Sequence, residues 1–507
     1  MRTGNLESIS KYLKLALALG AILYIATYIY IALSRIAYPF DLEWIEGASV
    51  GHVARILDGK GLYVSPTIDF VPLAYTPLYY YVSAAFAYVM GLGLAPLRLV
   101  SFLSSLGCLL IIMMMARRET GSSFAGLLAA GLYAAAFKLS GGWYDLARVD
   151  SLFVLLILIS IYILRFYNTL IAYILSGIFI FLAFMTKQTA ILISLPLMLN
   201  AIIIDKKRGL IFPITVLLLM GLGTIILNRI TNGWFDYYIF TVVSGRPMDA
   251  NMIFFFVWKI IPFVPALIFA LFYFFIRHSH ANNRQFIFYL MMAAGMVGVP
   301  SLSRFQVGTF LNVMMPVDAA IAILFGLGVF TAMEYIRSET INRRIIFEIA
   351  VYLFCMAGFI NFMYNPFAHI PSKLDREADK ELLATISKYK GEVFMPYHSE
   401  MPSLVGKKCY AHYVALAEVL RGNNTDAGKI LAENIRQKLR SGAFDAVILC
   451  SDEPDVETND IYKEYYIKDR PVFSKPLQFR MIEGVQLPPE TIYLPRNNMN
   501  NDMKEKE

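Results

Sequence analysis

Apolar blocks recur along this chain at the length that a helix needs to cross a lipid bilayer. Such a helix takes roughly 17–25 apolar residues, and in lipid it satisfies its own backbone hydrogen bonds. The chain is 57% hydrophobic and 16% charged, whereas a soluble domain is about 45–50% apolar and about 25% charged. The sequence therefore predicts an all-α polytopic membrane protein with about 11 transmembrane helices. We place these spans near 15–37, 98–116, 122–140, 151–167, 170–186, 189–204, 210–228, 251–276, 286–300, 309–332 and 345–361.

Basic residues fall in alternate loops between these spans, and short cytoplasmic loops are the ones that carry an excess of lysine and arginine. If the N-terminus is cytoplasmic, the basic loops lie on the cytoplasmic side only when residues 77–95 do not cross the membrane, because one more span would reverse every later loop. We therefore interpret 77–95, with Tyr79-Tyr80-Tyr81, as a helix in the outer interface, where amphipathic aromatic residues prefer to lie. The net charge of +7 is attributed to orientation, and no nucleic-acid partner is expected. The basic loops contain Arg117-Arg118, Arg165, Lys206-Lys207-Arg208, Arg277 with Arg284, and Arg337 with Arg343-Arg344.

The chain after about residue 361 has a different character, with charged amphipathic stretches and short β-type runs. Helical and strand patterns alternate there, which predicts a small α/β domain on the extracytoplasmic side. The predicted domains are a membrane domain at 1–361, whose first outer loop is 38–97, an extracytoplasmic α/β domain at 362–496, and a disordered polar tail at 497–507. Within the α/β domain, helices are expected over 375–389 and 427–439 and strands over 391–395 and 445–450.

Two acidic clusters lie at predicted outer ends of the spans. Asp41-Leu42-Glu43-Trp44-Ile45-Glu46 follows the first span, and Asp145 with Arg148-Val149-Asp150 precedes a later one. Carboxylates beside a membrane are costly to desolvate and usually mark a site, so the two clusters are expected to form one active site. The alternative is structural: Asp41 as a helix N-cap, Glu43 and Glu46 as first-turn acids favoured by the helix dipole, and Arg148 with Asp150 as an ion pair.

The order of four motifs resembles that of the GT-C superfamily of membrane glycosyltransferases. These are the acidic cluster after span one, Pro77-Leu78-Tyr79-Tyr80, Arg148-Val149-Asp150 and Thr186-Lys187-Gln188. The similarity extends over most of residues 15–335 and is nearest the branch that uses polyprenyl-phosphate sugars. That branch includes protein O-mannosyltransferases and the aminoarabinose transferases of lipid A, and the variants here resemble a poorly characterised bacterial and archaeal group.

The resemblance implies a sugar donor on a lipid phosphate and transfer outside the cytoplasm. Carried over by motif, Asp41 matches the catalytic base, Asp150 the second acidic position and Lys187 the lysine of the Thr-Lys motif. One departure concerns the lipid phosphate: related enzymes often have Lys or His before the Pro-Leu stretch, but Tyr75-Thr76 here is uncharged. The phosphate charge must then be neutralised by other residues.

Glycosyl transfer needs a base near the acceptor hydroxyl, which a carboxylate can supply. It also needs cations to stabilise the leaving phosphate; arginine binds it through a bidentate fork and lysine as a point charge. Aromatic side chains can form a floor for the sugar. The predicted catalytic residues are Asp41, Glu43, Glu46 and Asp150, and the predicted substrate-binding residues are Tyr75, Arg148, Lys187, Gln188, Arg246 and Arg304.

The predicted function is an integral membrane hexosyl- or pentosyltransferase that moves a sugar, with inversion, from a polyprenyl-phosphate carrier to a hydroxyl on the extracytoplasmic face, with Asp41 as base. The acceptor is a lipid, a glycan or a protein, and membrane lipids surround the protein. No metal is expected to be required, although Asp41-x-Glu43 and Asp150 offer the oxygen ligands that Mg²⁺ or Mn²⁺ takes.

The alternatives are a transporter or flippase of lipid-linked glycans and a scaffold for cell-envelope assembly. Transporters commonly show two related halves and ionisable residues at mid-membrane. This chain shows no internal repeat, and its charges lie at the ends of the spans. A scaffold leaves the acidic loop unexplained.

Overall fold

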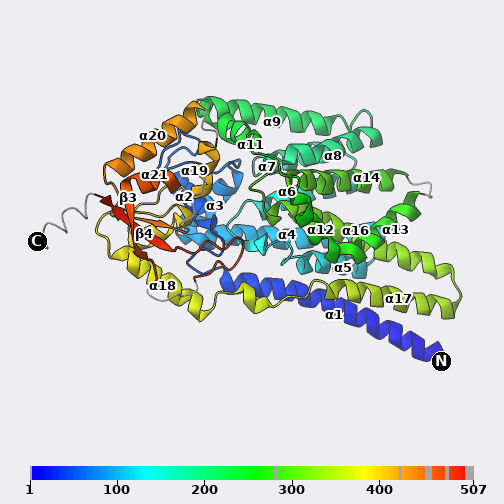
Figure 1. Ribbon diagram of the computed structural model, residues 1–507. Coiled ribbons are helices and arrows are strands. Elements are labelled where there is room, and N and C mark those ends of the chain that lie inside the picture. Colours follow the sequence, from blue (N-terminus) through cyan, green and yellow to red (C-terminus); the bar gives the residue numbers. More distant parts are fainter. Residues whose placement is uncertain (1–2, 279–282, 422–424, 451–458, 474–478, 497–507) are drawn as a thin grey trace, which may run out of the picture.

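In the computed structural model, long helices lie side by side in a bundle. The C-terminal region, by which we mean the described residues of 362–496, packs on one end of this bundle (Figure 1). The structure describes residues 3–278, 283–421, 425–450, 459–473 and 479–496. The N-terminal end of α1 lies at the opposite end of the bundle. The bundle helices are α1 (Thr3–Arg35), α4 (Leu94–Thr120), α5 (Ser123–Ala135), α6 (Asp150–Phe166), α7 (Leu170–Phe184), α8 (Ala190–Ile204), α9 (Ile211–Ile230), α12 (Met252–Ile260), α13 (Val264–His278), α14 (Asn283–Ala293), α15 (Val299–Ser303), α16 (Met315–Tyr335) and α17 (Ile341–Ile360).

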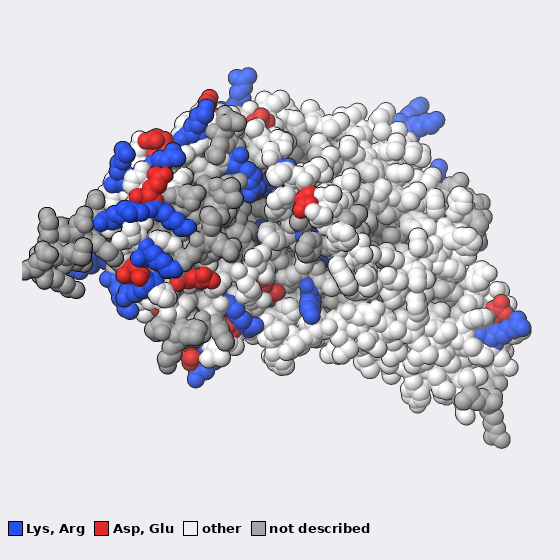
Figure 2. Space-filling view, in the orientation of Figure 1, with Lys and Arg blue, Asp and Glu red and all other residues white. Residues whose placement is uncertain are grey.

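Each of the eleven predicted spans coincides with helical structure, so the prediction of a polytopic helical protein is confirmed in kind. Six described helical segments are long and apolar enough to cross a membrane by length and composition, and several shorter apolar helices accompany them. The surface agrees with this assignment, because uncharged residues cover the middle of the bundle while charged residues gather over the C-terminal region and at the opposite tips (Figure 2).

The ends of the helices are marked by local signals that the sequence carries. The Ser122 side chain caps α5 by accepting a hydrogen bond from the Ala125 amide at 3.2 Å, and Thr169 caps α7 in the same way. At the other side of the molecule, Ser372 and Asp375 form a capping box at the start of α18. Such caps satisfy amide groups that the first helical turn leaves without a partner.

The loops that were predicted to share the cytoplasmic side lie at one end of the bundle. Arg165 pairs with Glu119 at 2.5 Å, and Arg277 pairs with Glu334 at 3.4 Å, so the connections after α4, α6, α13 and α16 meet there. The predicted outer residues lie at the other end, beside the C-terminal region. The alternation inferred from the basic loops therefore agrees with the packing, while which end faces the cytoplasm stays a prediction.

The segment 77–95 contains the short helix α3 (Leu78–Met90), which packs on α2 (Glu46–Leu57) and α4. Its 13 residues span roughly 20 Å at 1.5 Å per residue, less than the roughly 30 Å of a bilayer core. The equally short α5 coincides with a predicted span, so length alone does not set α3 apart. Figure 1 places α3 beside α2 at the end of the bundle on which the C-terminal region packs, and this position favours the interpretation of 77–95 as a segment that does not cross the membrane.

The C-terminal region forms a four-stranded sheet of order β1-β2-β4-β3, with β1 parallel to β2 and β4 antiparallel to both of its neighbours. The predicted helices and strands fall on α18, α20, β1 and β2, whereas β3 and β4 were not predicted. The predicted disordered tail 497–507 lies outside the described residues. The elements are α18 (Lys373–Ser387), α19 (Tyr413–Leu420), α20 (Asp426–Arg440), α21 (Asn459–Tyr465), β1 (Val393–Phe394), β2 (Ala446–Leu449), β3 (Tyr466–Pro471) and β4 (Thr491–Pro495).

Candidate active site

The acidic loop after α1 is folded around a buried ion pair between Glu46 and Arg98. Arg98, at the start of α4, donates to both Glu46 oxygens at 3.0 and 2.7 Å and also to the carbonyl oxygens of Tyr38 and Phe40. The Leu42 and Ala147 amides donate to the same carboxylate at 2.8 and 2.6 Å. Burial would raise the pKa of Glu46, but Arg98 outweighs burial and lowers it. Glu46 thus ties the two acidic clusters together.

Asp41 lies beneath the C-terminal region. His398, which follows β1, approaches Asp41 Oδ2 with Nδ1 at 3.6 Å and holds its other ring nitrogen against the Leu487 carbonyl oxygen at 2.9 Å. Both Asp41 oxygens and His398 Nδ1 are buried without a hydrogen bond. Burial raises the pKa of Asp41, and the imidazole opposes that rise. The predicted base is therefore buried beside an imidazole and has spare hydrogen-bonding capacity.

Glu43 joins the first acidic cluster to the second by an ion pair with Arg148 at 2.9 Å. Its second oxygen, Oε1, is buried and has no hydrogen bond. Burial raises the pKa of Glu43 to about 7, although Arg148 acts in the opposite direction. Arg148 also donates to the Tyr75 hydroxyl at 3.3 Å and lies 4.7 Å over the Trp143 ring.

Asp150, the first residue of α6, is paired with Lys187 from the connection between α7 and α8. Lys187 Nζ lies 2.7 Å from Asp150 Oδ1, which Asn312 also contacts at 3.0 Å. The other oxygen, Asp150 Oδ2, is buried without a partner. Three stretches far apart in sequence thus converge on one carboxylate, as expected if the outer ends of these helices share one site.

A cavity of about 200 Å³ opens between these groups. We call it the basic cavity, because Arg148, Lys187, Arg246 and Arg421 line it and Glu418 is its one acidic lining residue among those described. Its walls bring together five of the six predicted substrate-binding residues, and Trp44 and Tyr413 add aromatic surface. The five are Tyr75, Arg148, Lys187, Gln188 and Arg246.

Of these five, Arg246 and Gln188 are also held by neighbouring groups, whereas Arg304 and the four predicted acids do not line the cavity. Arg246 forms an ion pair with Glu418 of α19, and Gln188 donates to the Ala74 carbonyl oxygen at 3.0 Å. Arg304 donates to Thr309, and although Thr309 lines the basic cavity, Arg304 does not. Asp41, Glu43, Glu46 and Asp150 lie behind the cavity wall, where Glu43 and Asp150 hold its two innermost cations.

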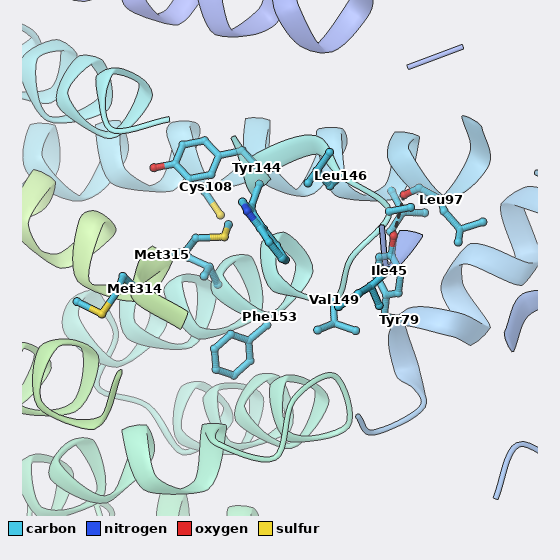
Figure 3. Close-up of a cluster of buried hydrophobic side chains, with 14 of the residues drawn as sticks. Ile45, Tyr79, Leu97, Cys108, Tyr144, Leu146, Val149, Phe153, Met314 and Met315 are labelled. Carbon is cyan, nitrogen blue, oxygen red and sulfur yellow. Dashed lines mark hydrogen bonds between the residues drawn. The ribbon is translucent and has the colours of Figure 1, made fainter. Parts of the chain in front are cut away.

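A closely packed apolar layer supports these charges (Figure 3). Val149, just before α6, and Phe153, in its first turn, belong to this layer, as do Ile45 of the acidic loop and Tyr79 of α3. The Tyr79 hydroxyl donates to the carbonyl oxygen of Leu97, the residue before Arg98, at 3.0 Å. Because protein interiors pack like crystals, this layer fixes where the loop and the start of α6 sit.

Sequence reasoning missed the partners that hold the site. Arg98 and Arg35 are both fully buried, and Arg35 binds Asp145, with an Nη2–Oδ1 distance of 2.7 Å, as well as Glu483 of the C-terminal region. An arginine at the first turn of an apolar span was a visible signal, because a charge there needs a partner. His398 and Glu400 carried no such signal, since they lie more than 350 residues from Asp41.

The acids proposed as Mg²⁺ or Mn²⁺ ligands do not have the form of a metal site. Glu43 and Asp150 each face a cation of the protein. Within the described ranges, no group of three or more His, Cys, Asp or Glu side chains is arranged to hold a metal ion.

Comparisons with known proteins fit this geometry. Residues 74–232 match the family model described as dolichyl-phosphate-mannose-protein mannosyltransferase. ArnT from Cupriavidus metallidurans bound to undecaprenyl phosphate superposes with a TM-score of 0.61 at 12% identity, over 93% of this chain and 97% of that one. The same enzyme in the apo state gives 0.59 at 13% identity, over 93% and 97%.

The archaeal oligosaccharyltransferase AglB from Archaeoglobus fulgidus, in complex with an inhibitory peptide and a dolichol-phosphate, gives a TM-score of 0.51 at 10% identity, over 84% of this chain and 69% of that one. A search of the curated proteins found no match. The resemblance that the motif order indicated is thus confirmed at the level of the fold: this chain is a multi-pass membrane protein with the GT-C fold of the membrane glycosyltransferases.

Proposed function

We propose that this protein is a membrane glycosyltransferase that takes a sugar from a polyprenyl-phosphate carrier and transfers it, with inversion, to an acceptor hydroxyl on the extracytoplasmic face. The observation that carries the proposal is the basic cavity, whose four cations lie beside two buried acidic clusters. Structural relatives solved with undecaprenyl phosphate and with a dolichol-phosphate support a lipid phosphate as the ligand.

The charges of the cavity suit a phosphate leaving group. Arg148 and Lys187 are held by Glu43 and Asp150, so they are oriented before the ligand arrives. Preorganised cations of this kind stabilise charge that develops as a bond breaks. Arg246, which pairs with Glu418 of α19, and Arg421 of the C-terminal region complete the basic lining. The uncharged Tyr75-Thr76 stretch leaves phosphate neutralisation to these four residues.

In the proposed step, the acceptor oxygen attacks the anomeric carbon as the bond from that carbon to the phosphate oxygen breaks. The hydroxyl proton goes to a carboxylate, and the lipid phosphate leaves with the electron pair. A single displacement inverts the configuration. Asp41 is the proposed base, since both of its oxygens are free of hydrogen bonds. Glu43, whose Oε1 is also free and whose other oxygen pairs with the lining residue Arg148, is the alternative to be tested beside it.

Binding of undecaprenyl phosphate by native mass spectrometry tests the donor site. A charge-assisted hydrogen bond is worth about 1.5–3 kcal/mol, so Lys187→Met should weaken binding about tenfold or more. Lys138→Met is the matched control, because Lys138 is exposed and does not line the basic cavity. Equal binding by wild type and Lys187→Met, or no binding by either, would contradict the donor assignment.

The same preparation separates the two candidate bases. Asp41→Asn should retain the carrier lipid, since Asp41 does not line the basic cavity. Glu43→Gln should bind the carrier more weakly, because it releases Arg148 from its ion pair. The variant that abolishes sugar transfer even at saturating carrier lipid identifies the base. If both transfer at the wild-type rate, the proposed mechanism is wrong.

A further inference from the structure

A second cavity, of about 780 Å³, lies on the other side of the acidic loop. It is formed by α2, by the turn between α3 and α4, and by residues 399–412 of the C-terminal region. Its size is within the range of roughly 300–1,000 Å³ that small-molecule sites occupy. None of the predicted substrate-binding residues lines it, so the proposed donor site leaves this cavity unexplained.

A thin wall separates the two cavities. His412 lines the second cavity and its neighbour Tyr413 lines the basic cavity. His412 Nε2 lies 3.0 Å from the carbonyl oxygen of Trp44, whose ring is 5.2 Å from the imidazole. Trp44 itself faces the basic cavity. The cavities are therefore adjacent, and the acidic loop 41–46 runs between them.

The charges of the second cavity are balanced, unlike those of the basic cavity. Lys60 pairs with Asp58 at 2.8 Å and Lys408 with Asp69 at 2.6 Å. Arg55 donates to the Gly61 carbonyl oxygen. The lining carries as many acids as basic residues, Asp58, Asp69 and Glu400 against Arg55, Lys60 and Lys408. Such a site offers little net positive charge to a phosphate but presents many hydrogen-bonding groups. This chemistry suits the hydroxyl groups of an uncharged sugar.

One acid of the second cavity stands beside the proposed base. Glu400 lines the cavity, is 6% exposed, and its carboxyl group makes no hydrogen bond within the described part of the chain. A methyl group added at Gly47 would lie 2.8 Å from Glu400 Cβ and 3.3 Å from Asp41 Oδ1, so the two side chains meet above this glycine. A hydroxyl bound near Glu400 would thus be close to the Asp41 carboxylate.

The rim of the second cavity is apolar and exposed. Met90 and Leu92 line the cavity yet are 51% and 50% exposed, and the preceding Tyr88 and Val89 are each 83% exposed. Apolar side chains gathered in this way at the mouth of a polar cavity mark a surface that contacts lipid or an apolar partner. The cavity therefore combines a polar interior with an entrance that suits a hydrocarbon chain.

We infer that the second cavity binds the acceptor, and that the acceptor is a membrane-anchored glycan: its sugar head enters the cavity and its lipid tail crosses the rim at 88–92. This inference rests on the proposed glycosyltransferase function and specifies its acceptor. It assigns the lipid phosphate of the donor to the basic cavity and the neutral sugar head of the acceptor to the second cavity, with the acidic loop between them.

Photolabelling with a decyl maltoside that carries a diazirine on its sugar tests the site, with the full chain in nanodiscs. Gly51→Phe fills the cavity, because Gly51 lines it and a Cβ there has no other atom within 4 Å. Gly221→Phe is the control, since Gly221 has the same free space on α9. Label is expected on 46–57 and 399–412, at least tenfold reduced by Gly51→Phe and unchanged by Gly221→Phe.

Undecaprenyl phosphate binding, measured on the same samples, should be equal in both variants. Label that survives Gly51→Phe, that excess undecaprenyl phosphate displaces, or that a soluble serine-containing peptide displaces would overturn the inference. If the glycan label maps to the second cavity but the wild type binds no undecaprenyl phosphate, the donor assignment fails and the acceptor role fails with it. The glycan site itself would then remain.

Discussion

The substitution Glu46→Gln separates a structural acid from a reacting one. Glu46 was predicted among the catalytic acids, yet each of its oxygens accepts two hydrogen bonds, from Arg98 and Ala147 on one side and from Arg98 and Leu42 on the other. Glutamine turns one of those oxygens into an NH₂ group that faces two donors. It also leaves the guanidinium of Arg98, which is fully buried, without its counter-charge.

Breaking a buried ion pair by removing one partner costs about 3–5 kcal/mol. We therefore expect Glu46→Gln to lower the unfolding temperature of the detergent-solubilised protein by several degrees, as followed by tryptophan fluorescence. The control is Asp58→Asn, which breaks an exposed pair with Lys60. Exposed pairs are worth about 0–1 kcal/mol, so this variant should unfold with the wild type.

Removing both charges in Glu46→Gln/Arg98→Met should recover part of the lost stability, because no buried charge is then left unpaired. Any remaining loss of transfer would come from displacement of the loop. If Glu46→Gln unfolds at the wild-type temperature but transfers no sugar, Glu46 is a reacting group and the reasoning from its four hydrogen bonds is wrong.

Three further outcomes are expected. Burial raises the pKa of Glu43 to about 7, so lowering the pH through 7 neutralises Glu43 and releases Arg148 from its ion pair. The rate of sugar transfer should therefore decline below pH 7. Glu43→Gln should remove this acid-side decline from the pH profile. Burial lowers the pKa of His398, but Asp41 and Cys450 raise it to about 10. The charged His398 ring therefore stabilises the fold fully at pH values below the ordinary histidine pKa of about 6.5, and this stabilisation is lost as the pH rises through 10. The unfolding temperature should fall over that alkaline range in the wild type, and His398→Gln should flatten the fall. Residues 1–361 expressed alone should not transfer sugar, and co-expression with 362–507 should restore transfer; activity of the first piece alone would show that the C-terminal region is dispensable.

The membrane helices were predictable because each signal is local. An apolar run of sufficient length predicts a span by itself, without knowledge of any distant partner. The predicted and observed helix boundaries differ where polar and apolar residues mix. The predicted span 98–116, for example, lies within the longer α4, which includes Arg98. Arg98 was taken as the edge of a span, since its partner Glu46 lies 52 residues away.

The sheet of the C-terminal region shows the opposite case. The strands β1 and β2 are short, fully buried runs of apolar residues and were predicted from them. The strand β3 reads Tyr-Ile-Lys-Asp-Arg-Pro, with exposed charges, and exists because its backbone pairs with β4. Strand formation at such an edge depends on a partner far along the chain, which a local pattern does not reveal.

The types of residue at the candidate site were predictable from the sequence, but which of them line the cavity was not. Shared sidedness brought Tyr75, Arg148, Lys187 and Gln188 to one cavity, as the motif order indicated. Arg304 was expected there for the same reason; it donates to the lining residue Thr309 but does not itself line the cavity. Sidedness gives the end of the bundle at which a residue lies, whereas the direction of its side chain depends on neighbours that only the folded chain supplies.

The C-terminal region deserves to be regarded as part of the catalytic unit, because it builds both cavities at once. His412 and Tyr413 are consecutive, yet they face different cavities, so a small shift of α19 would alter both sites together. By contrast, the segment 399–404 lines the second cavity and does not line the basic cavity. Exchanging this segment between related chains should therefore change binding at the proposed acceptor cavity while leaving the proposed lipid-phosphate site intact.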